Sequence, residues 1–201
     1  MKHSRTAYVI LGGLSIAPNL SGYDIRKAVE ANFGSFWGES YGQIYPALKA
    51  LAAAGLIKPT KTTSGPGRQR QEFTLTEAGR ECLREWLAQP FQNDPPRNEF
   101  MLKLFFCREA APGVAIAHVR ELQQRNQRML ATLSGIEAMA NQQQSKDPNL
   151  PYWMLTLGLG IAMTRAAVAW GESALEKLAS MEAATPANPT AAETDPAANE
   201  A

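Results

Sequence analysis

The side chains best suited to chemistry lie in two short segments of the first half of the chain. The first segment, residues 40–49, has the sequence SYGQIYPALK. Glutamine can bond an adenine edge through two hydrogen bonds, and tyrosine and proline can contact a thymine methyl group or the backbone. Hydroxyls, the free N–H groups of a first helical turn and a lysine suit phosphate. The candidate DNA contacts here are Ser40, Tyr41, Gly42, Gln43, Tyr45, Pro46 and Lys49. For the two tyrosines the alternative is half-buried packing against the preceding helix.

The second segment is a basic stretch around Gly65-Pro66-Gly67. Lys61, Arg68 and Arg70 flank this turn, and no acidic residue lies between Leu56 and Gln71. Three basic residues alone are more often an ordinary solvated loop. The segment just upstream favours the alternative, in which these side chains contact phosphates or the minor groove.

Catalytic constellations are scarce. The chain has two histidines and two cysteines, and they form no cluster with metal-ligand spacing. Gly65-Pro66-Gly67 lacks the Lys-Ser/Thr ending of a phosphate-binding loop. We therefore predict that the protein is not an enzyme and has no cofactor or metal. Cys82 and Cys107 are predicted to be reduced core thiols in a cytosolic protein.

Composition sets the class of protein. A length of 201 residues predicts one large domain or two small ones, and 45% hydrophobic residues can bury a core. The N-terminal segment is not expected to be a signal peptide. The longest uncharged apolar stretch, Tyr152 to Met163, is too short to span a bilayer, so we predict a soluble, cytoplasmic protein without membrane contact.

Local signals in the first half predict helix, helix, helix, hairpin, helix. Ser21 caps the second helix, a Ser-x-x-Gln capping box starts the third at Ser40, and Thr76 caps the fourth. Pro46 is awkward because an interior proline removes a helical hydrogen bond. This order is that of a winged helix-turn-helix, in which the Ser40 helix enters the major groove. The expected helices are 5–17, 22–33, one from 40, and 77–88, with strands at 56–58 and 72–75 and a loop over 59–71.

The second half is rich in helix signals. Long helices are expected over 113–144 and 150–181, with too little first-domain surface to cover them, which predicts a C2 dimer. The fold class is mainly α with a small β-hairpin wing, and an antiparallel helical dimerisation domain follows the winged helix-turn-helix. The expected boundaries are 1–88 for the DNA-binding domain, 89–97 for a linker, 98–181 for the dimerisation domain and 182–201 for a disordered tail.

Several motifs, taken in order, resemble the PadR family of transcriptional regulators. They are LSGYDI at 20–25, FW at 36–37, YGQIYPALK at 41–49, GLI at 55–57 and FTLT at 73–76 with Gly79. NEFMLKLFF at 98–106 and YWMLTL at 152–157, followed by Trp170, resemble the C-terminal helical domain of its larger subfamily. The resemblance covers residues 8 to about 181. The wing departs from the family pattern, because Gly65-Pro66-Gly67 precedes Arg68-Gln69-Arg70.

The resemblance implies a homodimeric repressor that binds an inverted-repeat operator in double-stranded DNA. In some members a small ligand, a phenolic acid in the founding case, releases the DNA. Phe105, Tyr152, Trp153 and Trp170 are candidates for an effector pocket, and the alternative is core and dimer packing. The alternative function is a helical interaction module whose winged helix binds a protein partner.

The net charge of +1 averages two unlike halves. Residues 1–90 hold eleven Lys and Arg against seven Asp and Glu, whereas residues 91–201 hold nine against twelve. The first half is therefore mildly basic. We expect modest non-specific DNA affinity per monomer, so that useful affinity depends on a dimer engaging two half-sites.

Overall fold

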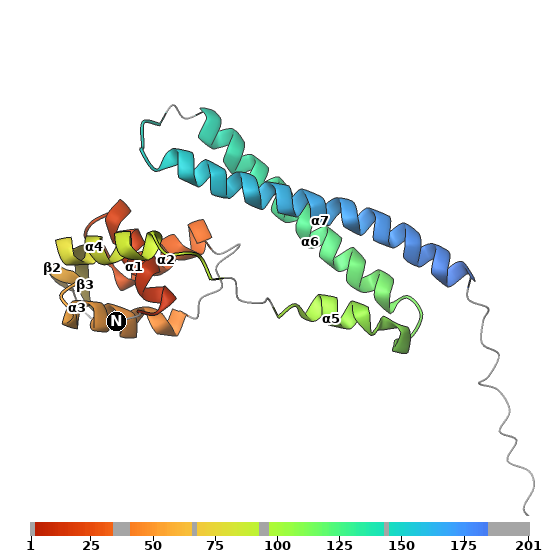
Figure 1. Ribbon diagram of the computed structural model, residues 1–201, viewed down its shortest axis with the longest axis horizontal. Coiled ribbons are helices and arrows are strands. Elements are labelled where there is room, and N and C mark those ends of the chain that lie inside the picture. Colours follow the sequence, from red (N-terminus) through yellow and green to blue (C-terminus); the bar gives the residue numbers. More distant parts are fainter. Residues whose placement is uncertain (1–2, 34–40, 66–67, 93–96, 143–144, 185–201) are drawn as a thin grey trace, which may run out of the picture. The chain divides into compact units, whose positions relative to one another are not determined.

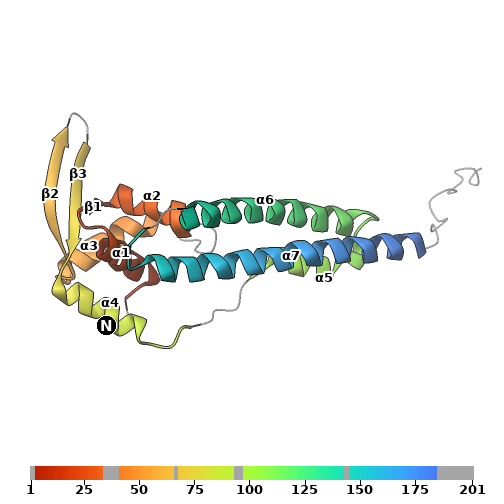
Figure 2. The ribbon, with the colours of Figure 1, turned by 90° about the horizontal axis from the view of Figure 1, so that it is seen from above.

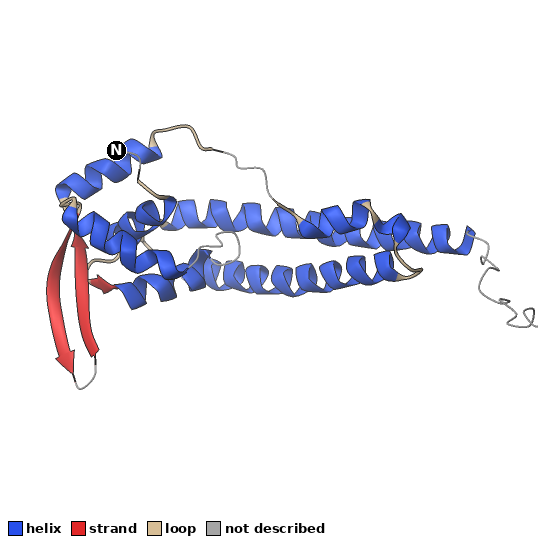
Figure 3. Cartoon of the chain, turned by 90° about the horizontal axis from the view of Figure 1, so that it is seen from below, coloured by secondary structure: helices blue, strands red, loops and turns tan. Residues whose placement is uncertain are grey.

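The computed structural model describes residues 3–33, 41–65, 68–92, 97–142 and 145–184. The chain divides into two units, Met1–Asp94 and Pro95–Ala201 (Figure 1). Most described residues are helical, and the strands form one small sheet in the first unit (Figure 3). The predicted tail from 185 onward lies outside the described residues, as do Ser40 and Pro66.

The first unit packs four α-helices and a three-stranded antiparallel sheet around one apolar core. Its largest fully buried side chains include Ile10, Leu11, Ile25, Leu51 and Ile57, which come from three helices and a strand. The elements are α1 Arg5–Ile16, β1 Leu20–Ser21, α2 Gly22–Phe33, a 3-10 turn Tyr41–Gln43, α3 Ile44–Ala53, β2 Ile57–Gly65, β3 Arg68–Leu75 and α4 Glu77–Leu87.

Two of the predicted helix caps are present as hydrogen-bonded caps. The Ser21 Oγ accepts from the Asp24 N–H at 3.3 Å, and the Asp24 Oδ2 accepts from the Ser21 N–H at 2.9 Å. Thr76 Oγ1 accepts from the Gly79 N–H at 3.1 Å. Each cap satisfies backbone donors that the helix itself leaves free, which is why α2 and α4 begin where the sequence predicts.

The strands are longer than predicted. β2 and β3 pair from Ile57 opposite Leu75 out to Gly65 opposite Arg68, so the expected loop over 59–71 is wrong. The threonine-rich segment has β-forming side chains, which outweigh the Pro and Gly signals. Pro59 is tolerated because β2 is an edge strand with a register shift between Pro59 and Lys61. The sequence prediction also missed the short strand β1, which pairs with β3.

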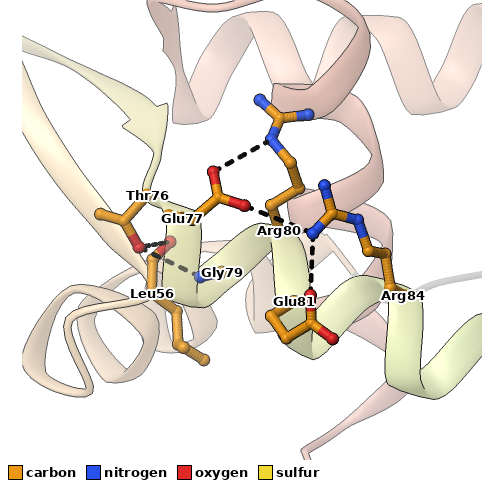
Figure 4. Close-up of polar contacts among 7 residues, drawn as sticks. All are labelled: Leu56, Thr76, Glu77, Gly79, Arg80, Glu81 and Arg84. Carbon is orange, nitrogen blue, oxygen red and sulfur yellow. Dashed lines mark hydrogen bonds and ion pairs between the residues drawn. The ribbon is translucent and has the colours of Figure 1, made fainter.

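The turn between α3 and β2 is bonded to the start of α4 (Figure 4). The Thr76 hydroxyl donates to the carbonyl oxygens of Gly55 and Leu56 at 2.8 and 2.9 Å, and the Thr76 N–H donates to Leu56 O at 3.1 Å. A Cβ at Gly79 would overlap that same Leu56 carbonyl oxygen, so α4 can approach only through a glycine. Gly55 has φ +71°, a left-handed conformation that suits glycine.

Of the two predicted core thiols, Cys82 packs against the core of the first unit, and Cys107 lies in the second unit. Both are unbonded and partly buried. Burial, with a smaller contribution from the Glu85 charge, raises the pKa of the Cys82 thiol. A raised pKa keeps this thiol protonated and poorly reactive at neutral pH.

The second unit is built on a long antiparallel helix pair (Figure 2). Its elements are α5 Glu99–Phe105, a 3-10 turn Cys107–Glu109, α6 Val114–Gln142 and α7 Leu150–Ala184. Gly160 lies against Leu133 and Gly171 against Gln123, and the Glu182 Oε1 accepts from the Gly113 N–H at 2.6 Å. Later residues of α7 therefore lie against earlier residues of α6, as in any antiparallel pair. The last helix ends at Ala184, three residues beyond the predicted end.

α7 carries an exposed apolar stripe. Seven large apolar side chains are exposed on α7. At about 100° per residue, six of them fall within roughly a quarter of the helix circumference, and the seventh, Trp153, lies about 80° outside it. By length and composition alone α7 could cross a membrane, and only 11% of its most apolar window is buried within the chain. We call this surface the α7 stripe; it consists of Tyr152, Leu155, Leu159, Met163, Trp170 and Met181.

Replacing Thr76 with alanine removes the α4 cap and its bonds to the α3–β2 turn. We expect Thr76→Ala to lower the free energy of unfolding by about 1–2 kcal/mol, measured by urea denaturation. Thr132→Ala is the matched control, because its exposed hydroxyl bonds only the Arg128 carbonyl of its own helix. Equal effects of the two substitutions would contradict a special role for Thr76.

Candidate nucleic-acid interface

α3 has one buried and one exposed face. Ile44, Ala47, Leu48 and Leu51 are buried in the core of the first unit. The opposite face is exposed and almost uncharged, and Tyr45 on it is 62% exposed. A large aromatic side chain held on an otherwise polar helix face favours a binding surface. The exposed candidate contacts in this segment are Gly42, Gln43, Tyr45, Pro46 and Lys49.

The start of α3 differs from the prediction. The α-helix begins at Ile44 after a 3-10 turn at Tyr41–Gln43, and its N-cap Gln43 makes no side-chain capping bond. The expected capping box joins Gln43 to Ser40, and Ser40 lies outside the described residues. Pro46 consequently falls in the first turn, where no intrahelical partner is lost and proline is well tolerated. The Gln43 side chain remains exposed and available for a ligand.

The β2–β3 ribbon carries the predicted basic residues in its backbone register. Lys61 faces Glu72, Thr63 faces Arg70 and Gly65 faces Arg68. Facing pairs and every second residue share a side of a ribbon, so positions 61, 68 and 70 belong to one face. Lys58 is exposed and pairs with Thr74, so its position belongs to the same face of the ribbon. The sequence prediction missed Lys58, because it placed this residue in a short strand instead of in the wing.

Two basic residues of the first unit form ion pairs within α4 (Figure 4). Arg84 contacts Glu81 at 2.8 Å and Glu77 at 3.3 Å, and Arg80 lies 3.8 Å from Glu77. The hydrogen bond to Glu81 is the main reason that the pKa of Arg84 is raised. These exposed pairs add little stability. The exposed face of α4 carries three glutamates against these two arginines, so α4 adds nothing to the positive charge of the unit.

The predicted effector residues do not gather into one pocket within the chain. Trp153 and Trp170 are 17 residues apart on α7, which is roughly 25 Å along a helix. Phe105 is 82% exposed and packs edge-to-face on Phe106, and Tyr152 is 71% exposed. Only Trp170 of the four lines a shallow hollow in the described part of the second unit. Its other lining residues are Leu104, Val119, Ser173, Ala174, Lys177 and Leu178.

Comparison with known proteins identifies both units. Residues 10–85 match the family described as transcriptional regulator PadR-like, and residues 96–179 match the one described as virulence activator alpha C-term. The chain is 32% identical to the negative transcriptional regulator PadR of Bacillus subtilis over 174 residues, which cover 84% of this chain and 94% of that protein. The chain belongs to the PadR-like family of transcriptional regulators.

Solved PadR-like structures extend the match to three dimensions. Bacillus subtilis PadR in complex with operator DNA aligns over 86% of this chain and 98% of that one, with 29% identity and a TM-score of 0.73. The Vibrio cholerae virulence activator AphA aligns over 88% and 99%, with 28% identity and a TM-score of 0.68. The predicted fold, a winged helix-turn-helix followed by a helical domain, is confirmed. PadR-like proteins are regulators, so the prediction that this one is not an enzyme is confirmed as well.

Proposed function

We propose that this protein is a soluble, cytoplasmic transcriptional repressor that binds a palindromic operator as a homodimer. The observation that carries the proposal is the exposed face of α3 beside a basic β-ribbon, in a chain that aligns with operator-bound Bacillus subtilis PadR. That relationship favours DNA over the alternative, a protein partner for the winged helix. The bases would be reached from α3, and the ribbon would supply phosphate contacts.

The proposed contacts divide by chemistry. Gln43 reads a base edge, and Tyr45 and Pro46 contact a thymine methyl group or the backbone. Ser40, Tyr41 and the first-turn N–H groups at Gly42 bind phosphate. The lysine and arginine contacts add affinity without sequence information. In this proposal they are Lys49, Lys61, Arg68 and Arg70, to which the register adds Lys58.

The α7 stripe supports the homodimer. Leu155, Leu159 and Met163 are each more than 60% exposed in the single chain, and they follow one another on the same side of α7. Burying such a continuous apolar stripe releases free energy, at roughly 25 cal/mol per Å². A second copy supplies the same stripe, which suits a two-fold interface. We therefore place the dimer contact on α7.

The effector proposal concerns the hollow beside Trp170. The indole lines the hollow with Lys177, and it meets the Phe100 ring edge-to-face at 5.9 Å. An aromatic wall and a nearby ammonium group suit a small aromatic carboxylate, and Bacillus subtilis PadR has been solved with p-coumaric acid. Phe105, Tyr152 and Trp153 would join such a site only where a second copy covers them.

Separate substitutions distinguish base reading from phosphate binding. On a selected genomic operator, Gln43→Ala should lower discrimination at one base pair by about 1–3 kcal/mol and spare non-specific binding. The double variant Arg68→Ala/Arg70→Ala should weaken binding to all sequences and reduce the salt slope by about 2. Fluorescence anisotropy at several salt concentrations measures both. Arg84→Ala, which removes an arginine paired on α4, is the control; equal loss on all sequences for Gln43→Ala contradicts base reading.

Charge placed on the α7 stripe should break the dimer. We expect Leu159→Glu to shift the protein toward monomer in sedimentation velocity and to lower operator affinity at least tenfold, because each half-site is then bound separately. Ala169→Glu puts the same charge at an exposed position about 80° around α7 from Leu159 and should leave the dimer intact. A Leu159→Glu protein that stays dimeric would rule out this interface.

Added p-coumaric acid should release the operator and quench tryptophan fluorescence. Trp170→Ala should weaken ligand binding about tenfold. Trp86→Ala removes the indole stacked on Tyr8 at 4.5 Å in the first unit, and it should keep the ligand response. Undiminished ligand binding by Trp170→Ala would contradict the hollow as the effector site.

A further inference from the structure

Gly22, the first residue of α2, is buried beneath the recognition helix α3. A Cβ built at this position would lie 2.9 Å from Cε1 and 3.4 Å from Cδ1 of the Tyr45 ring, and 3.0 Å from Cδ1 of Leu48. Carbon atoms in ordinary contact are about 3.5–4.0 Å apart. The backbone of Gly22 is not in the left-handed region. The glycine is therefore required by what packs on it and not by its own conformation.

The two side chains that cover Gly22 differ in their freedom. Leu48 is 3% exposed and belongs to the core, whereas Tyr45 is 62% exposed and has solvent on its other side. A methyl group at position 22 would therefore displace the Tyr45 ring before it displaced the buried leucine. Contact along one edge also restricts the rotamers of the ring before DNA arrives, which lowers the entropy lost on binding.

We propose that Gly22 is a positioning residue for operator binding: its missing side chain lets the Tyr45 ring rest against α2 in the orientation that contacts DNA. The inference rests on the proposed function, in which Tyr45 contacts the operator. It makes the specificity surface depend on a residue that touches no nucleic acid. Gly12 in α1 offers a contrast, because a Cβ there meets nothing within 4 Å.

A double-mutant cycle tests the proposal. Operator affinity is measured for the full-length wild type, Gly22→Ala, Tyr45→Ala and the double variant, with Gly12→Ala as the matched glycine control. We expect about tenfold weaker binding for Tyr45→Ala, a comparable loss for Gly22→Ala, and no further loss when the two are combined. Gly12→Ala should bind as the wild type does. Thermal unfolding of each variant separates loss of binding from loss of fold.

The outcomes separate this inference from the proposed function. Wild-type operator affinity for Gly22→Ala would overturn the positioning role. A double variant that loses the full affinity cost of Gly22→Ala in addition to that of Tyr45→Ala would overturn it as well. Unchanged binding by Tyr45→Ala would overturn it too while leaving operator binding intact. Absence of operator binding by the wild type would refute the proposed function itself. If Gly22→Ala does not fold, recovery of the fold in the double variant supports the steric partnership, and failure of both contradicts it.

Discussion

The DNA-binding unit depends on the way α4 is bonded onto the turn between α3 and β2. Thr76 caps α4 and also donates its hydroxyl to the carbonyls of Gly55 and Leu56, so one side chain ties together the end of the recognition helix, the base of the wing and the last helix of the unit. Gly79 allows the close approach that these bonds require. Because β2 leaves this turn and β3 returns to Thr76, the ribbon has a fixed root on the same residues that end α3. The two surfaces proposed to contact DNA are thereby held relative to each other, which is the preorganisation that a groove-reading module needs.

Charge and packing have separate tasks in this unit. The ribbon positions 58, 61, 68 and 70 share one face, whereas the arginines of α4 are paired with glutamates, so four basic positions are gathered on one face of the ribbon. Charge of this kind supplies affinity and orientation without reading sequence. The surface proposed to read the bases is nearly uncharged and depends on packing instead, above all on the contact of Tyr45 with Gly22. Sequence preference should therefore be more sensitive to small steric changes in α2 than to changes in surface charge.

The second unit is incomplete as a single copy. α6 and α7 pack closely through Gly160 and Gly171, yet the α7 stripe remains in solvent, although its side chains are as apolar as those of the core. In a pair of helices, each helix buries only the face that lies against the other. The outward-facing α7 stripe can therefore be buried only by a further helix surface. This explains why α7 has the length and composition of a membrane-crossing helix in a family of DNA-binding regulators. In this view the acidic half of the chain joins two copies, and their assembly compensates for the modest positive charge of each basic half.

The sequence by itself determined the order of the elements apart from β1, the caps at Ser21 and Thr76, the buried face of α3 and the family. These follow from local signals, in which a side chain acts on residues within about one helical turn or on the alternate positions of a strand. Only the tertiary structure decided that the wing is a long ribbon, that α3 begins at Ile44, and that Gly22 rather than Gly12 is sterically required. It also showed that Trp153 and Trp170 are too far apart to share a pocket in one chain. These features depend on contacts between segments far apart in the sequence, or on the full length of a helix or strand. A local sequence pattern contains neither kind of information.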